Sequence, residues 1–288
     1  MIGRFAPSPT GDLHFGSLVS AVGSYLEARS AGGKWLLRIE DIDPPREVAG
    51  SAQRIIDDLA RLGLHADGPV LYQSSRLTAY QESIEQLLRQ GLAYPCGCSR
   101  KDLPESGIYP GTCRNGIPPG REPRSIRLRV DTGNCSFRDR VQGLVSGPLA
   151  DPGGDFVIRR ADGFYAYQLA VVVDDHYQGV TQVVRGADLL DSTARQISLQ
   201  RALGLPTPEY MHLPVAVSAD GKKLSKRCRA DPVKHREPAL AVSEALQFLG
   251  QLPPPRMSLT GLWEWAIEHW DNALIPRVMT RLPGATKR

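Results

Sequence analysis

The sequence predicts an α/β protein: a parallel sheet with crossover helices, a small inserted subdomain and a short helical part at its C-terminal end. Strand-like and helix-like patterns alternate from residue 2 to residue 64, which is typical of parallel strands joined by crossover helices. Between 93 and 148 this alternation gives way to a stretch rich in Cys, Pro and Gly, and it then resumes. We therefore expect an α/β domain over 1–238, interrupted by an insertion at 93–148, and a helical subdomain over 239–288.

The first part of the chain carries the clearest element patterns. Residues 3–9 predict a strand that runs into a Pro/Gly turn, residues 16–31 a helix, and residues 34–41 a second strand. A further helix is expected over 48–64, because its apolar residues recur at helical spacing and a glycine follows them. These apolar residues and the closing glycine are Ile55, Ile56, Leu59, Leu62 and Gly63.

The later elements are predicted in the same way. Residues 155–176 and 180–190 contain near-continuous apolar runs, which are typical of strands buried on both faces. A helix is expected over 192–204. After residue 239, two helical segments flank the sequence LPPPRMS, and the tryptophans there predict a packing module rather than a binding surface: Trp263, Trp265 and Trp270.

Composition and charge limit the functional class only loosely. A hydrophobic content of 41% with 23% charged residues indicates a folded protein. The net charge of +4 favours a polyanionic partner without identifying one. Arginines cluster between Arg114 and Arg140, and their alternation in 125–130 predicts a strand with one cationic face, for which a merely solvated face is the equal alternative.

The chain shows no signal-like start and no apolar run that could cross a bilayer, so we expect a cytoplasmic location, no membrane partner and a monomer. Three of the five cysteines crowd between Cys96 and Cys113. This distribution argues against a secreted disulfide framework. Cys135 and Cys228 are expected to be free thiols.

A first chemical motif spans Arg4 to Ser17, RFAPSPTGDLHFGS, where a strand turns sharply into a helix. A helix N-terminus presents unpaired N–H groups and positive dipole, against which the phosphates of a nucleotide can lie. Gly11 and Gly16 allow close approach of the backbone, and His14 can donate to a phosphate oxygen. A satisfied turn histidine would be the simpler interpretation if this segment stood alone.

A second motif, GKKLSKR at 221–227, is a glycine-led basic loop. Lysines on such a loop are suited to neutralise the charge that develops on ATP phosphates as pyrophosphate leaves. A solvated basic loop is the alternative for this segment by itself. The pairing of the two motifs is what indicates nucleotide chemistry.

Together these segments resemble the HIGH and KMSKS signatures of class I aminoacyl-tRNA synthetases, here HFGS at 14–17 and KLSKR at 223–227. The segments RFAPSPTG, LLRIEDID, VVDDH, VVRGADLL and HLPVAVSADGKKLSKR resemble, in order and approximate spacing, the catalytic domain of the glutamyl-tRNA synthetase family. The resemblance covers about the first 230 residues. It implies a Rossmann-type class I catalytic domain over 1–238.

The resemblance also implies roles for individual residues. Arg4 and Arg185 would hold the carboxylates of bound glutamate, and Glu40 would accept the α-ammonium group. Lys223 and Lys226 would act with His14 as the catalytic groups. The implied glutamate-binding residues are Arg4, Phe5, Ala6, Pro7, Ser8, Glu40, Tyr167 and Arg185, and the implied ATP-binding residues are His14, Gly16, Ser17, Lys223 and Lys226. Mg²⁺ would accompany ATP.

The opening motif bears on the choice of amino acid, because RFAPSPTG resembles the glutamyl version more than the glutaminyl one. A carboxylate paired with buried arginine leaves charge uncompensated when glutamine replaces it. The sequence departs from the family at Ser17, which stands where the HIGH motif has its second histidine. Whatever that histidine does would fall here to Ser17, to backbone N–H groups or to the lysine loop.

Three thiols in a short Pro/Gly-rich stretch, at Cys96, Cys98 and Cys113, can satisfy most of a tetrahedral zinc site, and a small insertion with little core gains its fold from such a metal. We therefore expect one structural zinc ion rather than three unligated thiols. The spacing also resembles the Cys-x-Cys…Tyr-x-x-x-Cys site of a truncated subgroup of these enzymes, which implies Tyr109 as the fourth ligand.

About sixty residues follow the lysine loop, where a discrete glutamyl-tRNA synthetase has a long helical anticodon-binding region. The chain thus resembles the truncated subgroup that lacks this region. That resemblance implies activation of glutamate without tRNA, followed by transfer to the queuosine base of tRNA(Asp), with the insertion contacting the anticodon stem-loop through phosphates.

Three alternatives remain at this stage. The chain could instead charge the 3′ end of tRNA(Glu), it could be a catalytically silent tRNA-binding paralogue, or it could be a nucleotidylyltransferase that activates another acid. Intact Glu40 and Arg185 and an intact lysine loop speak against the silent paralogue. Arg4, Glu40, Tyr167 and Arg185 together argue against a different acid.

Overall fold

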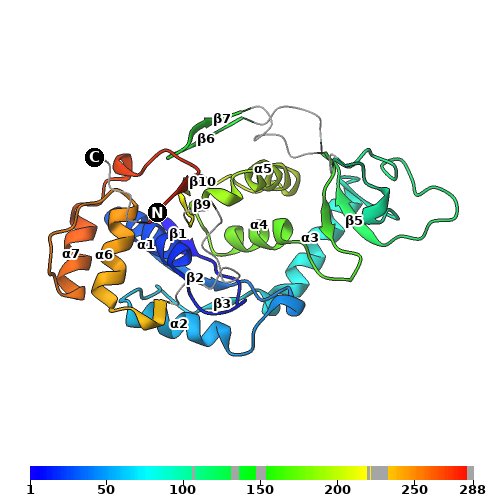
Figure 1. The fold of residues 1–288 in the computed structure, drawn as a ribbon. Helices are drawn as coiled ribbons and strands as arrows, with labels where there is room; N and C mark the ends of the chain where they lie inside the picture. The colour runs from blue at the N-terminus through cyan, green and yellow to red at the C-terminus, as the bar shows by residue number, and fades with distance from the viewer. Residues whose placement is uncertain (106–107, 131–135, 147–153, 219–220, 222–232, 284–288) are drawn as a thin grey trace.

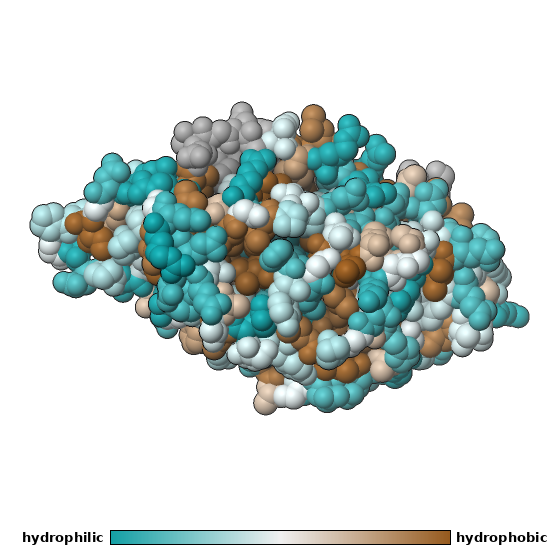
Figure 2. All heavy atoms as spheres, turned by 180° about the vertical axis from the view of Figure 1, so that it is seen from behind, coloured by the Kyte–Doolittle hydropathy of each residue, from teal (hydrophilic) through white to brown (hydrophobic). Residues whose placement is uncertain are grey.

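The computed structural model describes residues 1–105, 108–130, 136–146, 154–218, 221 and 233–283. Figure 1 shows a central α/β body with the insertion at one end and the C-terminal helices α6 and α7 at the other. No helix among the described residues is both long and apolar enough to span a membrane. Seen from behind, hydrophobic atoms form separate patches between hydrophilic side chains (Figure 2).

The N-terminal half of the body is a parallel sheet in the order β1-β2-β3, as the alternating pattern predicts. Arg4 on β1 lies beside Leu36 on β2 in the register. The elements of this half are β1 (Ile2–Phe5), α1 (Phe15–Ser30), β2 (Lys34–Ile39), α2 (Ser51–Arg61), β3 (Leu71–Tyr72) and α3 (Leu77–Arg89). Gly63 follows α2 with a φ of 77°, a left-handed conformation that favours glycine where a helix ends.

The other half is a second sheet in the order β7-β6-β10-β9, in which β6, β10 and β9 run parallel. Its elements are β6 (Phe137–Asp139), β7 (Gly143–Val145), β9 (Gln182–Gly186) and β10 (Glu209–Leu213), with α4 (Tyr167–Tyr177) and α5 (Ser192–Leu203) packed beside it. The two sheets meet at β1 and β9, where the N–H of Thr181 donates to the carbonyl of Ile2 over 2.9 Å. β6 and β7 lie inside the stretch 93–148, yet they pair with this sheet.

The prediction of a buried strand through residues 167–176 is wrong, because this segment is helix α4. Its residues Leu169, Ala170, Val171, Val172 and Val173 are all buried. Packing on nearly every side of a short helix produces the same unbroken apolar run as a strand covered on both faces, and periodicity cannot separate the two. The neighbouring strand prediction is confirmed at β9.

The insertion contains an antiparallel sheet in the order β4-β5-β8, whose third strand lies beyond the expected boundary at residue 148. These strands are β4 (Ala93–Cys96), β5 (Ser125–Leu128) and β8 (Val157–Arg159). The expected cationic face of β5 is not open to solvent at its centre, because Arg127 is only 6% exposed and its guanidinium stacks on the Tyr109 ring at 3.8 Å. The Arg127 side chain is therefore buried beside the cysteines and Tyr109 and is not solvated.

The C-terminal part packs against the first helix and closes the main core. It contains α6 (Pro238–Phe248), α7 (Leu259–Glu268) and the short strand β12 (Thr280–Arg281), which pairs in parallel with β11 (Val215–Ala216). The indole N–H of Trp263 donates to the carbonyl of Leu62 over 2.8 Å, and that of Trp270 donates to Glu27 over 2.7 Å. Together with Trp265, these residues pack on the core, as a packing module requires.

Candidate active site

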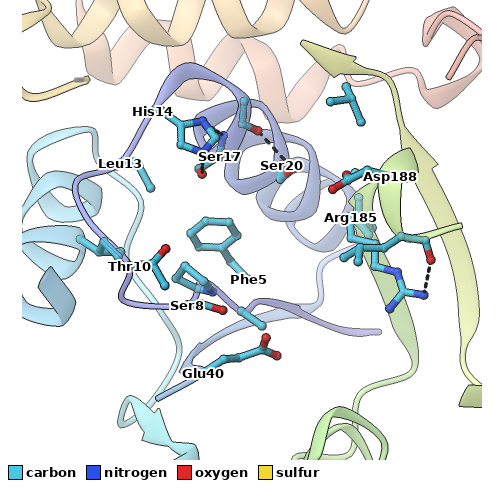
Figure 3. Close-up of a pocket in the computed structure, with 18 of the residues that line it drawn as sticks. Phe5, Ser8, Thr10, Leu13, His14, Ser17, Ser20, Glu40, Arg185 and Asp188 are labelled. Carbon is cyan, nitrogen blue, oxygen red and sulfur yellow. Dashed lines mark hydrogen bonds between the residues drawn. The ribbon is translucent and has the colours of Figure 1, made fainter. Parts of the chain in front are cut away.

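A cavity of about 780 Å³ opens where the carboxyl ends of β1, β2 and β9 meet the start of α1. Ligands of open α/β sheets bind at this edge of the strands. Figure 3 shows Glu40, Phe5 and His14 around the same open space. Among the residues that line the cavity are Arg4, Phe5, Ala6, Pro7, Ser8, His14, Gly16, Ser17, Glu40, Tyr167 and Arg185. All the glutamate-pocket residues expected from the sequence are thus brought together.

The first motif forms one wall of this cavity. His14 precedes α1 in extended conformation, and its Nδ1 accepts the N–H of Ser17 over 3.3 Å. The hydroxyl of Ser17 lies 3.1 Å from Nε2 of the same ring. Before the helix, Gly11 adopts a φ of 134°, and Ser51 bonds both its N–H and its carbonyl. The positive end of α1 therefore faces the cavity from a fixed turn, with the N–H of Ser17 capped by His14.

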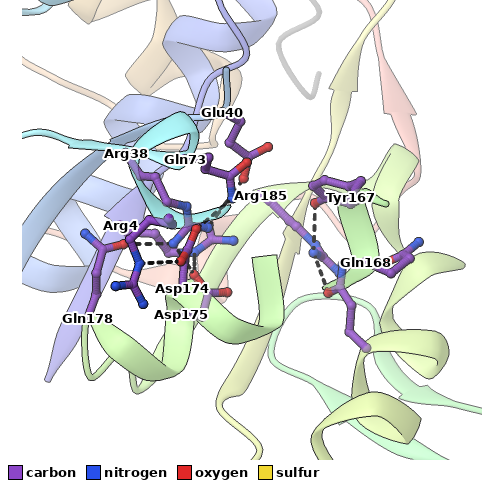
Figure 4. A network of polar contacts seen from close by, with 12 residues as sticks. Arg4, Arg38, Glu40, Gln73, Tyr167, Gln168, Asp174, Asp175, Gln178 and Arg185 are labelled. Carbon is purple, nitrogen blue, oxygen red and sulfur yellow. Dashed lines mark hydrogen bonds and ion pairs between the residues drawn. The ribbon is translucent and has the colours of Figure 1, made fainter. Parts of the chain in front are cut away.

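A buried network of charges forms the floor beside β1 and β2 (Figure 4). The carboxylate of Asp175 accepts Arg4 Nε at 3.0 Å and Arg38 Nη1 at 2.7 Å. Arg38 also reaches Glu40 at 3.4 Å. Burial would raise the pKa of Asp175, but the two guanidinium groups outweigh it and lower that pKa. For Glu40, burial dominates over the attraction of Arg38 and Arg4, and its pKa is raised.

Arg185 is held differently, by neutral groups. Its Nε donates to His212 Nε2 over 3.0 Å. Its terminal nitrogens donate to Gln196 and Thr193, each over 2.8 Å. Longer contacts run to the Tyr167 hydroxyl at 3.5 Å and to a backbone carbonyl at 3.3 Å. Among the residues that the structure describes, no carboxylate forms an ion pair with Arg185, so its positive charge is available to an anionic ligand.

Comparison with known proteins identifies the family of this chain. Residues 1–107 and 114–238 match the catalytic domain of class I tRNA synthetases of the glutamate and glutamine type. A glutamyl-Q tRNA(Asp) synthetase of Aromatoleum aromaticum is 52% identical over 99% of this chain and 93% of its own length. One from Dechloromonas aromatica is 54% identical over 96% of this chain and 95% of its own. The chain belongs to the glutamyl-Q tRNA(Asp) synthetase family.

Solved structures agree with this family assignment at the level of the fold. The crystal structure of glutamate-tRNA synthetase from Elizabethkingia anophelis superposes with a TM-score of 0.77 at 26% identity. The alignment covers 96% of this chain and 67% of that one. The predicted class I α/β fold with a parallel sheet is thereby confirmed.

The second signature of the family lies outside the described residues, so Lys223 and Lys226 have no position here. The described chain resumes at Val233, whose N–H donates to the carbonyl of Leu13 over 3.0 Å. The next residue, Lys234, pairs with Asp12 at 2.7 Å. The chain that follows the lysine segment is therefore fastened to the turn that precedes α1.

Sequence reasoning assigned no role to several residues of the site. Arg38 was such a case, although it lies on β2 only two residues before Glu40, which follows the strand directly. Asp175 lies in the VVDDH segment that carried the family resemblance. Asp188 also lines the cavity. His212 had no visible signal, because its contact with Arg185 depends on the pairing of β9 with β10.

A second cluster lies in the insertion, where the thiols of Cys96, Cys98 and Cys113 are all within 4.8 Å of one another. All three are buried and none forms a disulfide. The Tyr109 hydroxyl lies 3.4 Å from Cys96 Sγ and 3.8 Å from Cys98 Sγ. This phenol also accepts the backbone N–H of Cys113 over 2.7 Å. The four residues expected from the sequence thus share one small volume.

The surroundings of the cluster favour thiolate at Cys96, whereas burial raises the pKa of Cys98. Burial would raise the pKa of Cys96, but hydrogen bonds from Tyr109, from the N–H of Cys98 and from Arg127 lower it to about 7. The Arg127 Nε lies 3.3 Å from Cys96 Sγ. Arg121 donates to Cys98 Sγ over 3.5 Å. Three converging sulfurs with cationic neighbours form a donor set that suits zinc, which binds thiolate rather than thiol.

Proposed function

We propose that this chain activates L-glutamate with ATP to glutamyl-adenylate, without tRNA, and transfers the glutamyl group to the queuosine base in the anticodon of tRNA(Asp). The observation that carries the proposal is the match at 52% and 54% identity, over nearly the whole chain, to relatives named glutamyl-Q tRNA(Asp) synthetase. Such a reaction makes the protein a ligase that converts ATP to AMP and pyrophosphate.

Recognition of glutamate uses the charges around the cavity. Arg185, whose guanidinium donates to neutral acceptors within the described part of the chain, binds one carboxylate of the substrate, and Arg4 faces the other. The Glu40 carboxylate accepts the α-ammonium group, and Tyr167 contributes its hydroxyl beside Arg185. Residues 5–8 form the wall of the pocket. Glutamine would leave the Arg185 charge unmatched, which gives discrimination.

Activation takes place toward the start of α1. An oxygen of the glutamate α-carboxylate attacks the α-phosphorus of ATP in line, the bond to the bridging oxygen breaks, and pyrophosphate leaves. His14 and the positive end of α1 at Gly16 and Ser17 attract the negative charge of the phosphates. By their place in the family motif, Lys223 and Lys226 add positive charge. Mg²⁺ bound with ATP supplies further neutralisation.

In the second step, a ring hydroxyl of the modified base attacks the carbonyl carbon of the mixed anhydride. An ester bond to glutamate forms, AMP departs, and the hydroxyl proton passes to solvent. No side chain of the enzyme becomes covalently attached, so no nucleophilic residue is assigned. The enzyme contributes by holding the adenylate and the base in place.

The cysteine cluster is proposed to hold one structural zinc ion through Cys96, Cys98 and Cys113, with Tyr109 as the fourth ligand. Three buried thiols within 4.8 Å and the adjacent phenol support this assignment. The metal would fasten the loop that carries Tyr109 and Cys113 to β4, which gives the insertion a fold that its small core does not provide. The ion would lie outside the adenylation chemistry.

The insertion is also proposed to contact the anticodon stem-loop through phosphates. Arg124, just before β5, has an exposed side chain; Arg138 is also exposed, but it lies on β6 in the second sheet. Arg114 and Arg121 instead pair with Asp155 and Asp102. Exposed arginines are suited to phosphate contacts, whereas the paired ones hold the insertion together.

The first test is ATP–pyrophosphate exchange with glutamate, glutamine or aspartate and no tRNA. We expect exchange with glutamate alone, since only glutamate matches both carboxylate sites and Glu40. Absence of glutamate-dependent exchange would contradict tRNA-independent activation and would point to a silent tRNA-binding paralogue.

The second test uses labelled glutamate and tRNA from cells with and without the pathway to queuosine. Transfer should require tRNA(Asp) that carries queuosine. Persistent transfer to queuosine-free tRNA would reject the modified base as acceptor and favour charging of a 3′ end, which periodate treatment of the terminal ribose would then abolish.

A further inference from the structure

The side chain of Arg185 is the end of a buried chain of hydrogen bonds that begins in another strand. Asp139 on β6 contacts His212 on β10, and His212 contacts Arg185 on β9. Asp139 and His212 are 1% and 0% exposed, and neither lines the cavity. This series of hydrogen bonds therefore reaches Arg185 from the side away from the cavity, through the neighbouring strands β6 and β10.

Asp139 is arranged as an ionised acceptor. Its Oδ1 accepts the backbone N–H groups of Val141, Gln142 and His212, over 3.0, 2.8 and 3.2 Å. Its Oδ2 lies 2.6 Å from His212 Nδ1. Burial would raise the pKa of Asp139, but the imidazole and the backbone donors outweigh it and lower that pKa. A carboxylate that can only accept requires Nδ1 of His212 to carry its proton.

The opposite nitrogen of His212 is then an acceptor. Burial lowers the pKa of His212 to about 4 in spite of Asp139, so the ring is neutral at physiological pH. With the proton fixed on Nδ1, the lone pair of Nε2 faces Arg185 Nε at 3.0 Å. Nε2 also lies 3.2 Å from the Thr193 hydroxyl.

This arrangement orients a guanidinium without neutralising it at close range. A carboxylate in direct contact with Arg185 would compete with an acidic ligand, as Asp175 does for Arg4. A neutral imidazole fixes the plane of the guanidinium instead and leaves its charge for the ligand. We propose that Asp139 and His212 are positioning residues that set the preference of the site for a carboxylate over an amide. This inference rests on the proposed binding of glutamate by Arg185.

A purely structural role is the competing explanation, because Asp139 also closes the turn between β6 and β7 through Val141 and Gln142. The Asp139→Asn variant separates the two. Its amide oxygen would stay with the backbone N–H donors, so its NH₂ group would face Nδ1 of His212. The ring proton would then move to Nε2 and oppose the N–H of Arg185 Nε.

The experiment measures ATP–pyrophosphate exchange against glutamate, glutamine and ATP concentration. For Asp139→Asn we expect the KM for glutamate to rise about 10- to 100-fold, as for the loss of one charge-assisted hydrogen bond. The ratio of kcat/KM for glutamate to that for glutamine should fall, while the KM for ATP stays within about threefold. His212→Leu should behave alike, and His212→Gln, whose amide oxygen can accept from Arg185, should recover much of the preference.

Asp155→Asn is the matched control, because Asp155 is a buried aspartate next to β8 that accepts from Tyr94 and from the N–H of Val130. It should lower stability without changing the glutamate-to-glutamine ratio. An unchanged ratio and glutamate KM in folded Asp139→Asn would overturn the proposal. So would a ratio that falls equally in Asp155→Asn.

The His212 tautomer is read separately, by two-bond ¹H–¹⁵N correlation of the imidazole in the free protein. We expect the proton on Nδ1 in the wild type and on Nε2 in Asp139→Asn. A wild-type proton on Nε2 overturns the positioning role even if no exchange activity exists. Loss of glutamate-dependent exchange in the wild type, with the expected tautomers, would instead refute the proposed function.

Discussion

Replacement of Glu40 by glutamine tests the assignment of the ammonium site. Glu40 lies at the end of β2, is 8% exposed, and faces the cavity. A hydrogen bond to a charged group contributes about 1.5 to 3 kcal/mol. Since about 1.4 kcal/mol corresponds to a tenfold change, we expect Glu40→Gln to raise the KM for glutamate about 10- to 100-fold and to leave the KM for ATP nearly unchanged.

The variant should still fold. Arg38 would keep Asp175 at 2.7 Å and the amide oxygen of Gln178 at 2.8 Å. Because burial raises the pKa of Glu40, its ionised form opposes folding at neutral pH, and glutamine removes this cost. We therefore expect a thermal unfolding midpoint equal to or above that of the wild type. A lost activity with an intact unfolding transition then reports on binding.

The assay is glutamate-dependent ATP–pyrophosphate exchange. Glu47→Gln serves as the control, since Glu47 lies on the loop after β2 and is absent from the cavity lining. A glutamate KM in Glu40→Gln within about threefold of the wild type, worth less than about 0.7 kcal/mol, would refute the ammonium-binding role. An equal effect of Glu47→Gln would also do so.

Three further outcomes follow from the same structure. The wild-type KM for glutamate should rise as pH falls, with a midpoint above the ordinary carboxyl pKa of 4.5. Binding needs ionised Glu40, and burial raises the pKa of this group beside Arg38, Arg4 and Asp175. A midpoint below 4.5 would contradict the role of Glu40. The free energy of unfolding should fall by on the order of 3 kcal/mol as the pH drops from 6.5 toward 4. The reason is that His212, which is packed against Asp139, Arg185 and Tyr210 and lies near Asp188, is neutral when folded and protonates on unfolding. In chemical denaturation at a series of pH values, His212→Gln should reduce this pH dependence. Cys98→Ser should lose zinc, measured by atomic emission, and its insertion should become more sensitive to protease. Cys135→Ser, which changes a cysteine outside the expected ligand set, should retain the metal. Full zinc content in Cys98→Ser would reject the site.

Local patterns were sufficient for the elements that open the fold. The turn from β1 into α1 and the amphipathic helix α2 have signals that neighbouring residues create. The line-up of Arg4, Glu40 and Arg185 at one cavity was expected only through the family resemblance, because it depends on how β1, β2 and β9 are arranged in space. Their individual roles remain predictions.

Other features of the structure could not be predicted from the sequence, for physical reasons. Helix α4 has the unbroken apolar run of a strand, since it is packed on most sides. Arg127 looked like a surface charge, yet it is buried against Tyr109, a contact set by the fold of the insertion. The link from Asp139 to Arg185 joins residues far apart in the chain, and no local spacing encodes it.

The pairing of β6 with β10 has a consequence for protein engineering. A chimera built at the sequence boundaries 93 and 148 would exchange Asp139 together with the cysteine cluster. A graft intended to change only RNA contacts would then also alter the support behind the amino-acid pocket. A successful chimera should retain the recipient's own hairpin from Phe137 to Val145. The unit to exchange is thus defined by the pairing of the strands and not by a continuous range of residues.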